Sequence, residues 1–248
     1  MNLLVRADDL GYSEAINYGI AKSVIDGIVK NVGVMVNMPA TEHGLALLKD
    51  VEVCYGCHTN ICVGRPLTDP ALIPSITNPD GTFKASRDYR NAADDFVVLE
   101  EVIIEIEAQY QRFVELIGRQ PQYFEGHAVA SPNFMKGLER VAAAHGLKYS
   151  GISFDAKPII VNGKKVYLSM DSMGPDYDPF ESLKKLTEHP HADGVDMMVL
   201  HPGYLDAFIL NTSTLTIPRT QEVEMAISAE TKAWLADHDV HLLTYDDL

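Results

Sequence analysis

The chain has little of several features that would define a protein class. Its 248 residues include only three cysteines and one tryptophan, and 20 basic residues stand against 35 acidic ones. Three cysteines are too few for a disulfide framework, so we expect reduced thiols and a cytoplasmic protein. The formal charge of −15 argues against a nucleic acid or an anionic membrane surface as a partner.

Long apolar segments are also lacking. No window approaches 18 consecutive apolar residues, so we expect no transmembrane span. The first residues, MNLLVRADDLG, have no basic n-region, and Asp8 and Asp9 interrupt any apolar core of a leader. We therefore expect no secretory signal.

One short motif, CYGCH at residues 54–58, matches the C-x-x-C-H pattern of covalent haem attachment. The surrounding residues alternate in the manner of a strand, and strand residues three apart point to opposite faces. Cys54 and Cys57 then cannot share a haem or a metal ion. We therefore expect that only His58 of this motif is functional.

Short apolar runs alternate with longer amphipathic segments along the chain. This alternation predicts βαβ units in one mostly parallel sheet, and about seven strands favour an α/β fold with an irregular or incomplete (β/α) TIM-like barrel. We expect one domain over residues 1–248. The expected strands are 2–7, 32–37, 51–58, 122–126, 148–152, 195–200 and 240–244, and the expected helices begin after Ser13 and cover 94–117, 133–144 and 220–236.

Two insertions interrupt this rhythm, at about residues 62–93 and 153–180. The first is rich in Pro, Asn and Asp, and long loops in compact domains are commonly functional. The second contains Asn162-Gly163, a pair typical of a hairpin turn. We expect both insertions to wall a cleft at one end of the barrel.

Polar residues follow four of the expected strands at their carboxyl ends: Asp8-Asp9, His58, His127 and His201. Active sites of α/β barrels lie at this end. A carboxylate with two imidazoles suits a catalytic divalent metal that keeps open positions, and the second aspartate could act as a general base. Adjacent strand residues point apart, so the two aspartates converge only if the strand ends there.

Simpler roles exist for each residue alone. Asp8 and Asp9 could cap the helix that begins after Ser13, and a single histidine at a strand end is commonly a hydrogen-bonded structural residue. A second histidine pair, His189 and His191, has a spacing that can bind metal but lies in a loop beside a proline.

The motifs together resemble the YdjC-like carbohydrate deacetylases, a family that includes chitin-disaccharide deacetylase. The segments that carry the resemblance are RADDLGYS (6–13), GCHTNI (56–61), GRPL (64–67), PSITNPDGTF (74–83), EGHAVASP (125–132), HPGY (201–204) and PRTQEVEM (218–225). They occur in order over nearly the whole chain, and they are specific only in combination.

The resemblance implies an irregular (β/α) barrel that hydrolyses the acetyl group from an N-acetylated sugar. The implied substrate is a small oligosaccharide such as a chitobiose-type disaccharide, with or without a phosphate group. Asp9, His58 and His127 match the family's metal ligands. The family metal is Mg²⁺, whereas imidazole ligands favour Zn²⁺ on grounds of softness.

The resemblance also implies catalytic roles. Asp8 matches the base, His201 matches the acid that protonates the leaving amine, and Arg219 matches an arginine that orients the site. From residue type alone, Tyr12 and Tyr204 are candidate stacking surfaces for the sugar. A homodimer is the default assembly.

One segment departs from the family pattern. Where the family reads D-S-H-x-H, residues 125–129 read EGHAV, with a longer acid and no second histidine. Two alternatives stay open: a glycosidase for a small (phospho)disaccharide, with Asp176, Asp178 or Glu125 as the distant carboxylate, and a non-catalytic sugar-binding protein on the same barrel. Released acetate, released monosaccharide, or binding alone would distinguish these alternatives.

Overall fold

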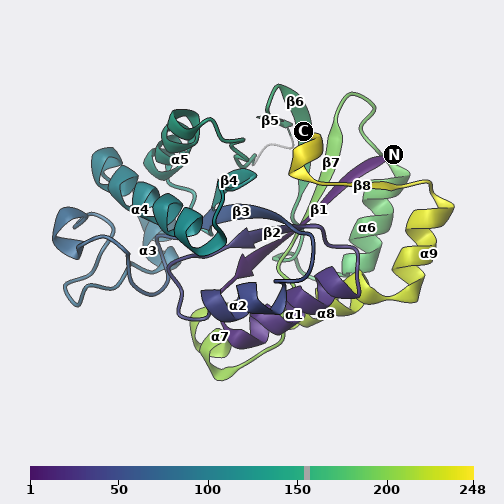
Figure 1. Cartoon of the computed structure of the whole chain (residues 1–248), viewed down its shortest axis with the longest axis horizontal. Helices are drawn as coiled ribbons and strands as arrows, with labels where there is room; N and C mark the ends of the chain where they lie inside the picture. The colour runs from purple at the N-terminus through teal and green to yellow at the C-terminus, as the bar shows by residue number, and fades with distance from the viewer. Residues whose placement is uncertain (154–156) are drawn as a thin grey trace.

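The computed structural model of the chain describes residues 1–153 and 157–248. Its centre is a curled, mostly parallel sheet with the strand order β4-β3-β2-β1-β7-β6-β5 (Figure 1). This half-barrel confirms the expected α/β fold with an incomplete TIM-like barrel. The strands are β1 Asn2–Leu10, β2 Asn31–Val34, β3 Cys54–Thr59, β4 Tyr123–Gly126, β5 Ile159–Val161, β6 Lys164–Ser169, β7 Val195–Leu200 and β8 His241–Leu243.

Strand β1 is the centre of the sheet. It pairs with β7 along most of its length, while its first residues pair with β8 and its later residues pair with β2, all in parallel. Every residue of β1 after Asn2 is buried, including the charged residues Arg6, Asp8 and Asp9, which fits its paired neighbours on both sides.

One of the expected strands needs correction. Residues 148–152 do not form a strand, and only Tyr149 makes an isolated bridge, to Phe124. The strand that continues the sheet beyond β7 is instead β6, which belongs to the expected second insertion. Its hairpin with β5 turns at Asn162-Gly163, where φ is 48° and 78°, so the expected turn is confirmed. Part of this insertion, residues 154–156, lies outside the described residues.

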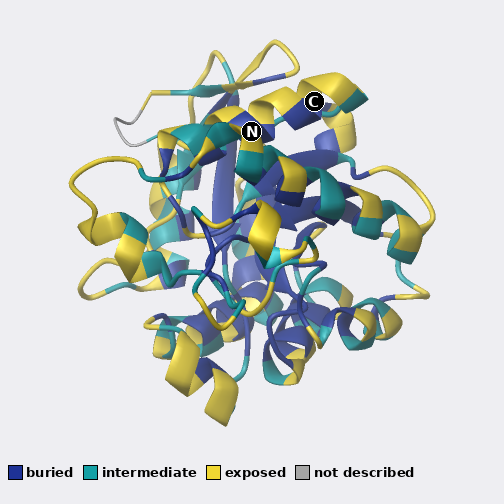
Figure 2. Cartoon of the chain, turned by 90° about the vertical axis from the view of Figure 1, so that its left-hand side faces the viewer, coloured by how far each residue is buried: buried dark blue, intermediate teal, exposed yellow. Residues whose placement is uncertain are grey.

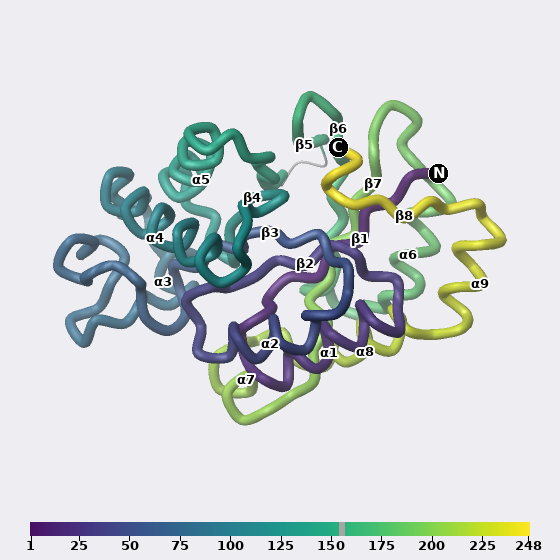
Figure 3. Tube along the Cα trace, viewed as in Figure 1, coloured from purple at the N-terminus to yellow at the C-terminus, as the bar shows by residue number. Residues whose placement is uncertain are grey.

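The helices surround the outer face of the sheet. Figures 1 and 3 show α1, α2 and α8 along one side, α4 and α5 beside β3 and β4, and α6 with α9 at the other end. Their bounds are α1 Glu14–Ile25, α2 Thr41–Leu47, α3 Ser86–Asn91, α4 Leu99–Ile117, α5 Pro132–His145, α6 Pro179–Glu188, α7 Ala207–Thr212, α8 Ile217–Ile227 and α9 Ala229–Asp237, with 3₁₀ turns at Pro70–Leu72 and Tyr245–Asp247.

Local capping signals explain several helix ends. The Ser13 hydroxyl accepts a hydrogen bond from the Ile16 amide at the start of α1, and Gly118 and Gly146 end α4 and α5 in the left-handed conformation. The single helix expected over 220–236 is wrong. Ser228 is extended there, and its hydroxyl caps a separate helix, α9.

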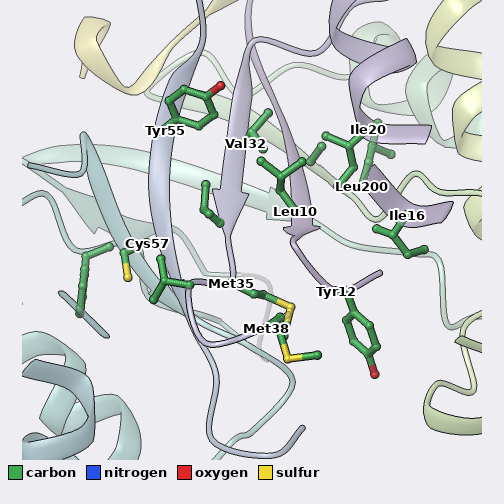
Figure 4. Packing of buried hydrophobic residues seen from close by; sticks show 14 of the residues in the cluster. Leu10, Tyr12, Ile16, Ile20, Val32, Met35, Met38, Tyr55, Cys57 and Leu200 are labelled. Atoms are coloured by element: carbon green, nitrogen blue, oxygen red, sulfur yellow. The ribbon is translucent and has the colours of Figure 1, made fainter. Parts of the chain in front are cut away.

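Two hydrophobic clusters lie on opposite faces of the sheet. The larger one packs the sheet against the helices, and Figure 4 shows Leu10 and Leu200 on the side that faces Ile16 and Ile20 of α1. The smaller one fills the inside of the half-barrel. Figure 2 shows the buried strands at the centre and exposed residues on the outer helices.

The two cysteines of the C-x-x-C-H motif belong to different clusters. Cys57 packs in the outer cluster and Cys54 in the inner one, as expected for strand residues three apart. Burial raises the pKa of both thiols to about 12, so neither is a thiolate near neutral pH. The structure therefore supports neither haem attachment nor a redox pair. In the described residues, no helix is long and apolar enough to cross a membrane.

Gly56 generates a prediction about packing inside the half-barrel. A Cβ at this position would lie 2.2 Å from ring atoms of Tyr123. We expect Gly56→Ala to lower the free energy of unfolding by about 1–3 kcal/mol or more. Urea denaturation measures this change. Because Tyr123→Leu removes the opposing ring, the double variant should lose less stability than the two single losses added together. Strict additivity would contradict this packing.

Candidate metal and catalytic site

The two-residue period of the strands brings the candidate residues to one face. Asp8 of β1, His58 of β3 and Glu125 of β4 point into the half-barrel, and His127 and His201 continue the same alternation beyond β4 and β7. All five lie near the carboxyl end of the sheet. The structure therefore brings together the polar strand ends that the sequence singled out.

Asp9 reaches this face by a different route. The expected strand end at Asp8-Asp9 is wrong, because β1 continues to Leu10. Asp9 instead has φ of 80°, in the left-handed region, and the register with β2 shifts between Ala7 and Leu10. This bulge turns the Asp9 side chain to the inside of the half-barrel, beside that of Asp8.

Three donor atoms converge at this point. Asp9 Oδ1 lies 3.1 Å from His58 Nε2 and 3.0 Å from His127 Nδ1, and the two nitrogens lie 2.9 Å apart. All three side chains are buried. One carboxylate oxygen and two imidazole nitrogens are a common ligand set of a catalytic divalent ion, so these residues fit the metal that the family resemblance implies.

Neighbouring charged side chains orient these donors. Arg219 Nη2 lies 2.8 Å from Asp9 Oδ2, which leaves Oδ1 for the cluster, and Arg219 Nε donates to the Leu215 carbonyl. Glu125 forms a short hydrogen bond with His58 Nδ1 and thereby directs Nε2 toward Asp9. The longer acid of the altered 125–129 segment thus supports a candidate ligand.

Asp8 has a different partner. Arg6 Nε lies 2.8 Å from Asp8 Oδ1, and Arg6 Nη2 donates to Asp8 Oδ2 at 2.8 Å. Gly33 of β2 leaves room for this pair, since a Cβ there would lie 3.0 Å from an oxygen of Asp8 and 3.0 Å from one of Glu125. The sequence analysis assigned no role to Arg6. Its position two residues before Asp8, on the same strand face, was the available signal.

Burial and charge shift the pKa values of the three candidate ligands. Burial opposes ionisation of Asp9, but Arg219 and His127 outweigh it and lower the Asp9 pKa. Burial also opposes a charged imidazole at His127, yet Asp9 raises the pKa of His127 to about 9. The pKa of His58 is raised as well, because Glu125 and Asp8 outweigh its burial.

His201 has the opposite electrostatic character. Burial, with the positive charge of Arg219 nearby, lowers the pKa of His201 to about 4, so the imidazole is neutral at pH 7. Its Nδ1 has no hydrogen-bond partner in the described part of the chain. Its backbone amide donates to Glu222 Oε2 at 2.6 Å, a support that the sequence analysis missed.

A cavity of about 430 Å³ opens above these residues. Its floor is polar and its walls are largely apolar, with Val129, Met135, Leu168 and Met170 among the lining side chains. This volume is in the usual range for a small-molecule site.

The two candidate stacking tyrosines differ in place. Tyr12 lines the cavity, with its ring 5.8 Å from the His127 ring and 5.8 Å from the Arg219 guanidinium carbon. Tyr204 does not line the cavity and lies in a separate surface hollow with Tyr18 and Lys22. The structure therefore does not bring Tyr204 to the predicted binding site.

The second histidine pair forms no ligand cluster. His191 Nδ1 lies 2.7 Å from Asp196 Oδ1, and its ring stacks on Tyr167 with 3.6 Å between centroids. Across residues 1–153 and 157–248, neither His189 nor His191 belongs to a group of three potential ligand atoms.

The fold and the converging donors define the class, an α/β half-barrel protein with a candidate divalent-metal centre at the carboxyl ends of its strands. The family model of the YdjC-like proteins matches residues 2–237, and the chain belongs to this family. Carbohydrate deacetylase 2 of Listeria innocua is 30% identical to this chain over an alignment of 270 positions, which covers 100% of this chain and 99% of that protein.

Solved structures share the fold. A proposed cellobiose-phosphate cleavage protein of Enterococcus faecalis superposes with a TM-score of 0.86 at 21% identity, over 99% of this chain and 98% of that one. A family 4 acetyl xylan esterase of Clostridium thermocellum, solved with a cobalt ion, gives a TM-score of 0.54 at 11% identity, over 100% of this chain and 89% of that one. At these identities the likeness concerns the fold alone.

The raised imidazole pKa values generate a prediction about metal binding. Ligation needs neutral imidazoles, so an ion must displace the proton that His127, with a pKa of about 9, carries at pH 7. We expect the affinity for Zn²⁺ or Co²⁺ to rise about tenfold per pH unit for each proton displaced. Calorimetry in buffers of different ionisation enthalpy measures the protons released. His191→Ala is the control, and a pH-independent affinity between pH 6 and 8 would contradict the assignment.

Proposed function

We propose that the protein is a divalent-metal-dependent deacetylase that hydrolyses the N-acetyl group of a small oligosaccharide of the chitobiose type. The observation that carries this proposal is the convergence of Asp9, His58 and His127 beside Asp8 on the floor of the cavity. Membership of the YdjC-like family and the full-length similarity to carbohydrate deacetylase 2 support the reaction class.

The proposed chemistry needs a nucleophile, a base and an acid. A divalent cation held by Asp9, His58 and His127 would supply Lewis acidity, which activates water and polarises the amide carbonyl. Asp8, which forms an ion pair with Arg6, accepts the proton of the attacking water. Glu125 keeps His58 in one orientation throughout.

His201 is the proposed acid for the departing amine. An amine leaves poorly unless it is protonated, and His201 lines the cavity with Nδ1 unpartnered in the described residues. Because the pKa of His201 is lowered to about 4 by burial, the imidazole is neutral before the reaction. The proton that it delivers is therefore taken up during turnover.

The carboxylate geometry favours this reaction over glycoside hydrolysis. Potential ligand atoms of Asp8 and Glu125 lie within 4.8 Å of one another, and both carboxylates lie within ion-pair distance of the same Arg6 guanidinium group. Glycosidases place their two carboxyl groups about 5–9.5 Å apart, on either side of the bond. Asp178 caps α6, and neither it nor Asp176 lines the cavity.

The proposal also concerns the identity of the metal ion and of the sugar. Two imidazoles and one carboxylate suit Zn²⁺ by softness, while the family resemblance favours Mg²⁺.

Arg90 of α3 lines the outer cavity, one helical turn after Ser86, and has no ion-pair partner in the described residues. It is the candidate contact for a phosphate group on the sugar.

The first test is release of acetate from N,N′-diacetylchitobiose and its phosphorylated form, before and after chelation and restoration of Mg²⁺ or Zn²⁺. Asp8→Asn should lower kcat by about 10²–10⁴-fold, because it removes the base. His58→Ala should abolish the response to metal, and His191→Ala should leave activity unchanged. Acetate release that survives chelation and Asp8→Asn would refute the proposal. Monosaccharide release would support a glycosidase instead, and sugar binding without any product would support a binding protein.

Arg90 provides a test of the phosphate. Arg90→Ala should raise KM for the phosphorylated disaccharide by about 10-fold or more, since a charge-assisted contact is lost, and leave KM for the neutral disaccharide unchanged. The matched control is Arg87→Ala on the same helix, whose residue does not line the cavity. Equal effects of Arg90→Ala on both sugars would contradict a phosphate contact.

A further inference from the structure

We infer that Arg6 is a positioning residue of this site, which fixes the direction of the Asp8 carboxylate beside the ligand cluster and keeps Glu125 on His58. The inference goes beyond the proposed function in assigning a role to Arg6, and it rests on the proposed role of Asp8 as base. It is carried by the contacts of one buried guanidinium group.

Arg6 uses each side of its guanidinium group. Nε and Nη2 face the two oxygens of Asp8, each at 2.8 Å, and Nη2 also lies 3.8 Å from Glu125 Oε2. Nη1 donates to the hydroxyl groups of Tyr245 at 3.0 Å and Ser150 at 3.3 Å. A single buried cation is thus shared by two buried carboxylates, and its planar fork faces both oxygens of Asp8, with a hydrogen bond from Nη2 to Oδ2 and an ion-pair contact of Nε with Oδ1.

Two aromatic rings restrict the position of the Arg6 guanidinium group. The Tyr123 ring centroid lies 5.9 Å from the guanidinium carbon, and the Tyr123 and Tyr245 rings stack with 3.8 Å between centroids. Both tyrosines are fully buried, and Arg6 itself is 5% exposed. The guanidinium group therefore has little freedom to move, and the carboxylates that it binds share that restriction.

The two adjacent aspartates have separate arginines. Arg219 binds only Oδ2 of Asp9, so Oδ1 stays directed at His58 and His127, whereas Arg6 faces both oxygens of Asp8. This difference distinguishes Asp9, the candidate metal ligand, from Asp8, the proposed base. Without Arg6, the Asp8 carboxylate would be free to turn toward the candidate metal position, and the Glu125 carboxylate would lose its positive neighbour.

Lysine cannot replace this arginine fully. An ammonium group is a point charge without the planar fork, so it can keep the local charge but cannot fix the Asp8 plane while also facing Glu125 and Tyr245. Arg6→Lys therefore separates the effect of charge from the effect of orientation, and Arg6→Met removes both.

The test compares the wild type, Arg6→Met, Arg6→Lys and the surface control Arg112→Met in one set of measurements. We expect Arg6→Met to lower kcat by about 10²-fold, because the base is misplaced, with KM within about threefold. Calorimetry should give a dissociation constant for Zn²⁺ that is unchanged or smaller, since Asp8 becomes available as a ligand. Arg6→Lys should recover only part of kcat, and Arg112→Met should match the wild type.

Three outcomes would overturn the inference. One is an unchanged kcat in folded Arg6→Met. Another is a parallel loss of kcat, zinc affinity and thermal stability, which a purely structural role produces. The third is a full recovery of kcat by Arg6→Lys.

Two further measurements keep the inference testable if Arg6→Met does not fold or if the wild type has no activity. Tyr245→Phe removes one acceptor of Arg6 and should lower kcat severalfold at constant KM; an unchanged kcat would count against the inference. Absence of acetate from the wild type on any sugar refutes the proposed function, not the positioning role. In that case crystal structures of zinc-bound wild type and Arg6→Lys decide, because an unmoved Asp8 carboxylate overturns the inference and a turned one supports it.

Discussion

The left-handed backbone of Asp9 is the constraint on which the site depends. With ordinary strand alternation, Asp9 would point outward with Ala7 and pack against the helices. Its φ of 80° turns it inward instead, so that two consecutive carboxylates share one cavity. This conformation is unfavourable for most residues and is tolerated by aspartate. It is held by the ion pair with Arg219 and by the turn in which the Tyr12 amide donates to the Asp9 carbonyl.

Pairing of buried charges is the second principle of the site. Isolated charges inside a half-barrel would be very costly, and Asp8, Asp9 and Glu125 each have a cationic or imidazole partner. Arg6 faces Asp8, Arg219 faces Asp9, and Glu125 faces His58. The pairs are arranged so that free donor atoms of Asp9 and His58 meet at one point, while the partners occupy the remaining positions.

Much of this could be predicted from the sequence, because strand alternation is a local property. Polar residues at the ends of apolar runs were correctly expected to meet, and the Asn162-Gly163 turn follows from residue chemistry. The contact of Glu125 with His58 could not be predicted, since it depends on the register of β3 with β4, whereas the ion pair of Arg6 with Asp8 joins residues two apart on one face of β1 and was missed although the spacing signalled it. The break at Ser228 and the missing strand at 148–152 likewise reflect tertiary packing, which overrides weak local preferences.

Tyr245 has a consequence for the order in which the molecule assembles. Its hydroxyl meets Arg6 across 239 positions of sequence, and β8 pairs with the first residues of β1. Contacts between distant parts of the chain require loop closure before they become favourable, so they form more slowly than helices. A refolding chain should therefore acquire its helices before β1 pairs with β7 and β8 and the floor beneath Asp8 is complete. The ability of the site to act would then appear in the last kinetic phase of refolding. A nascent chain would gain this ability only after the 245–247 turn had docked.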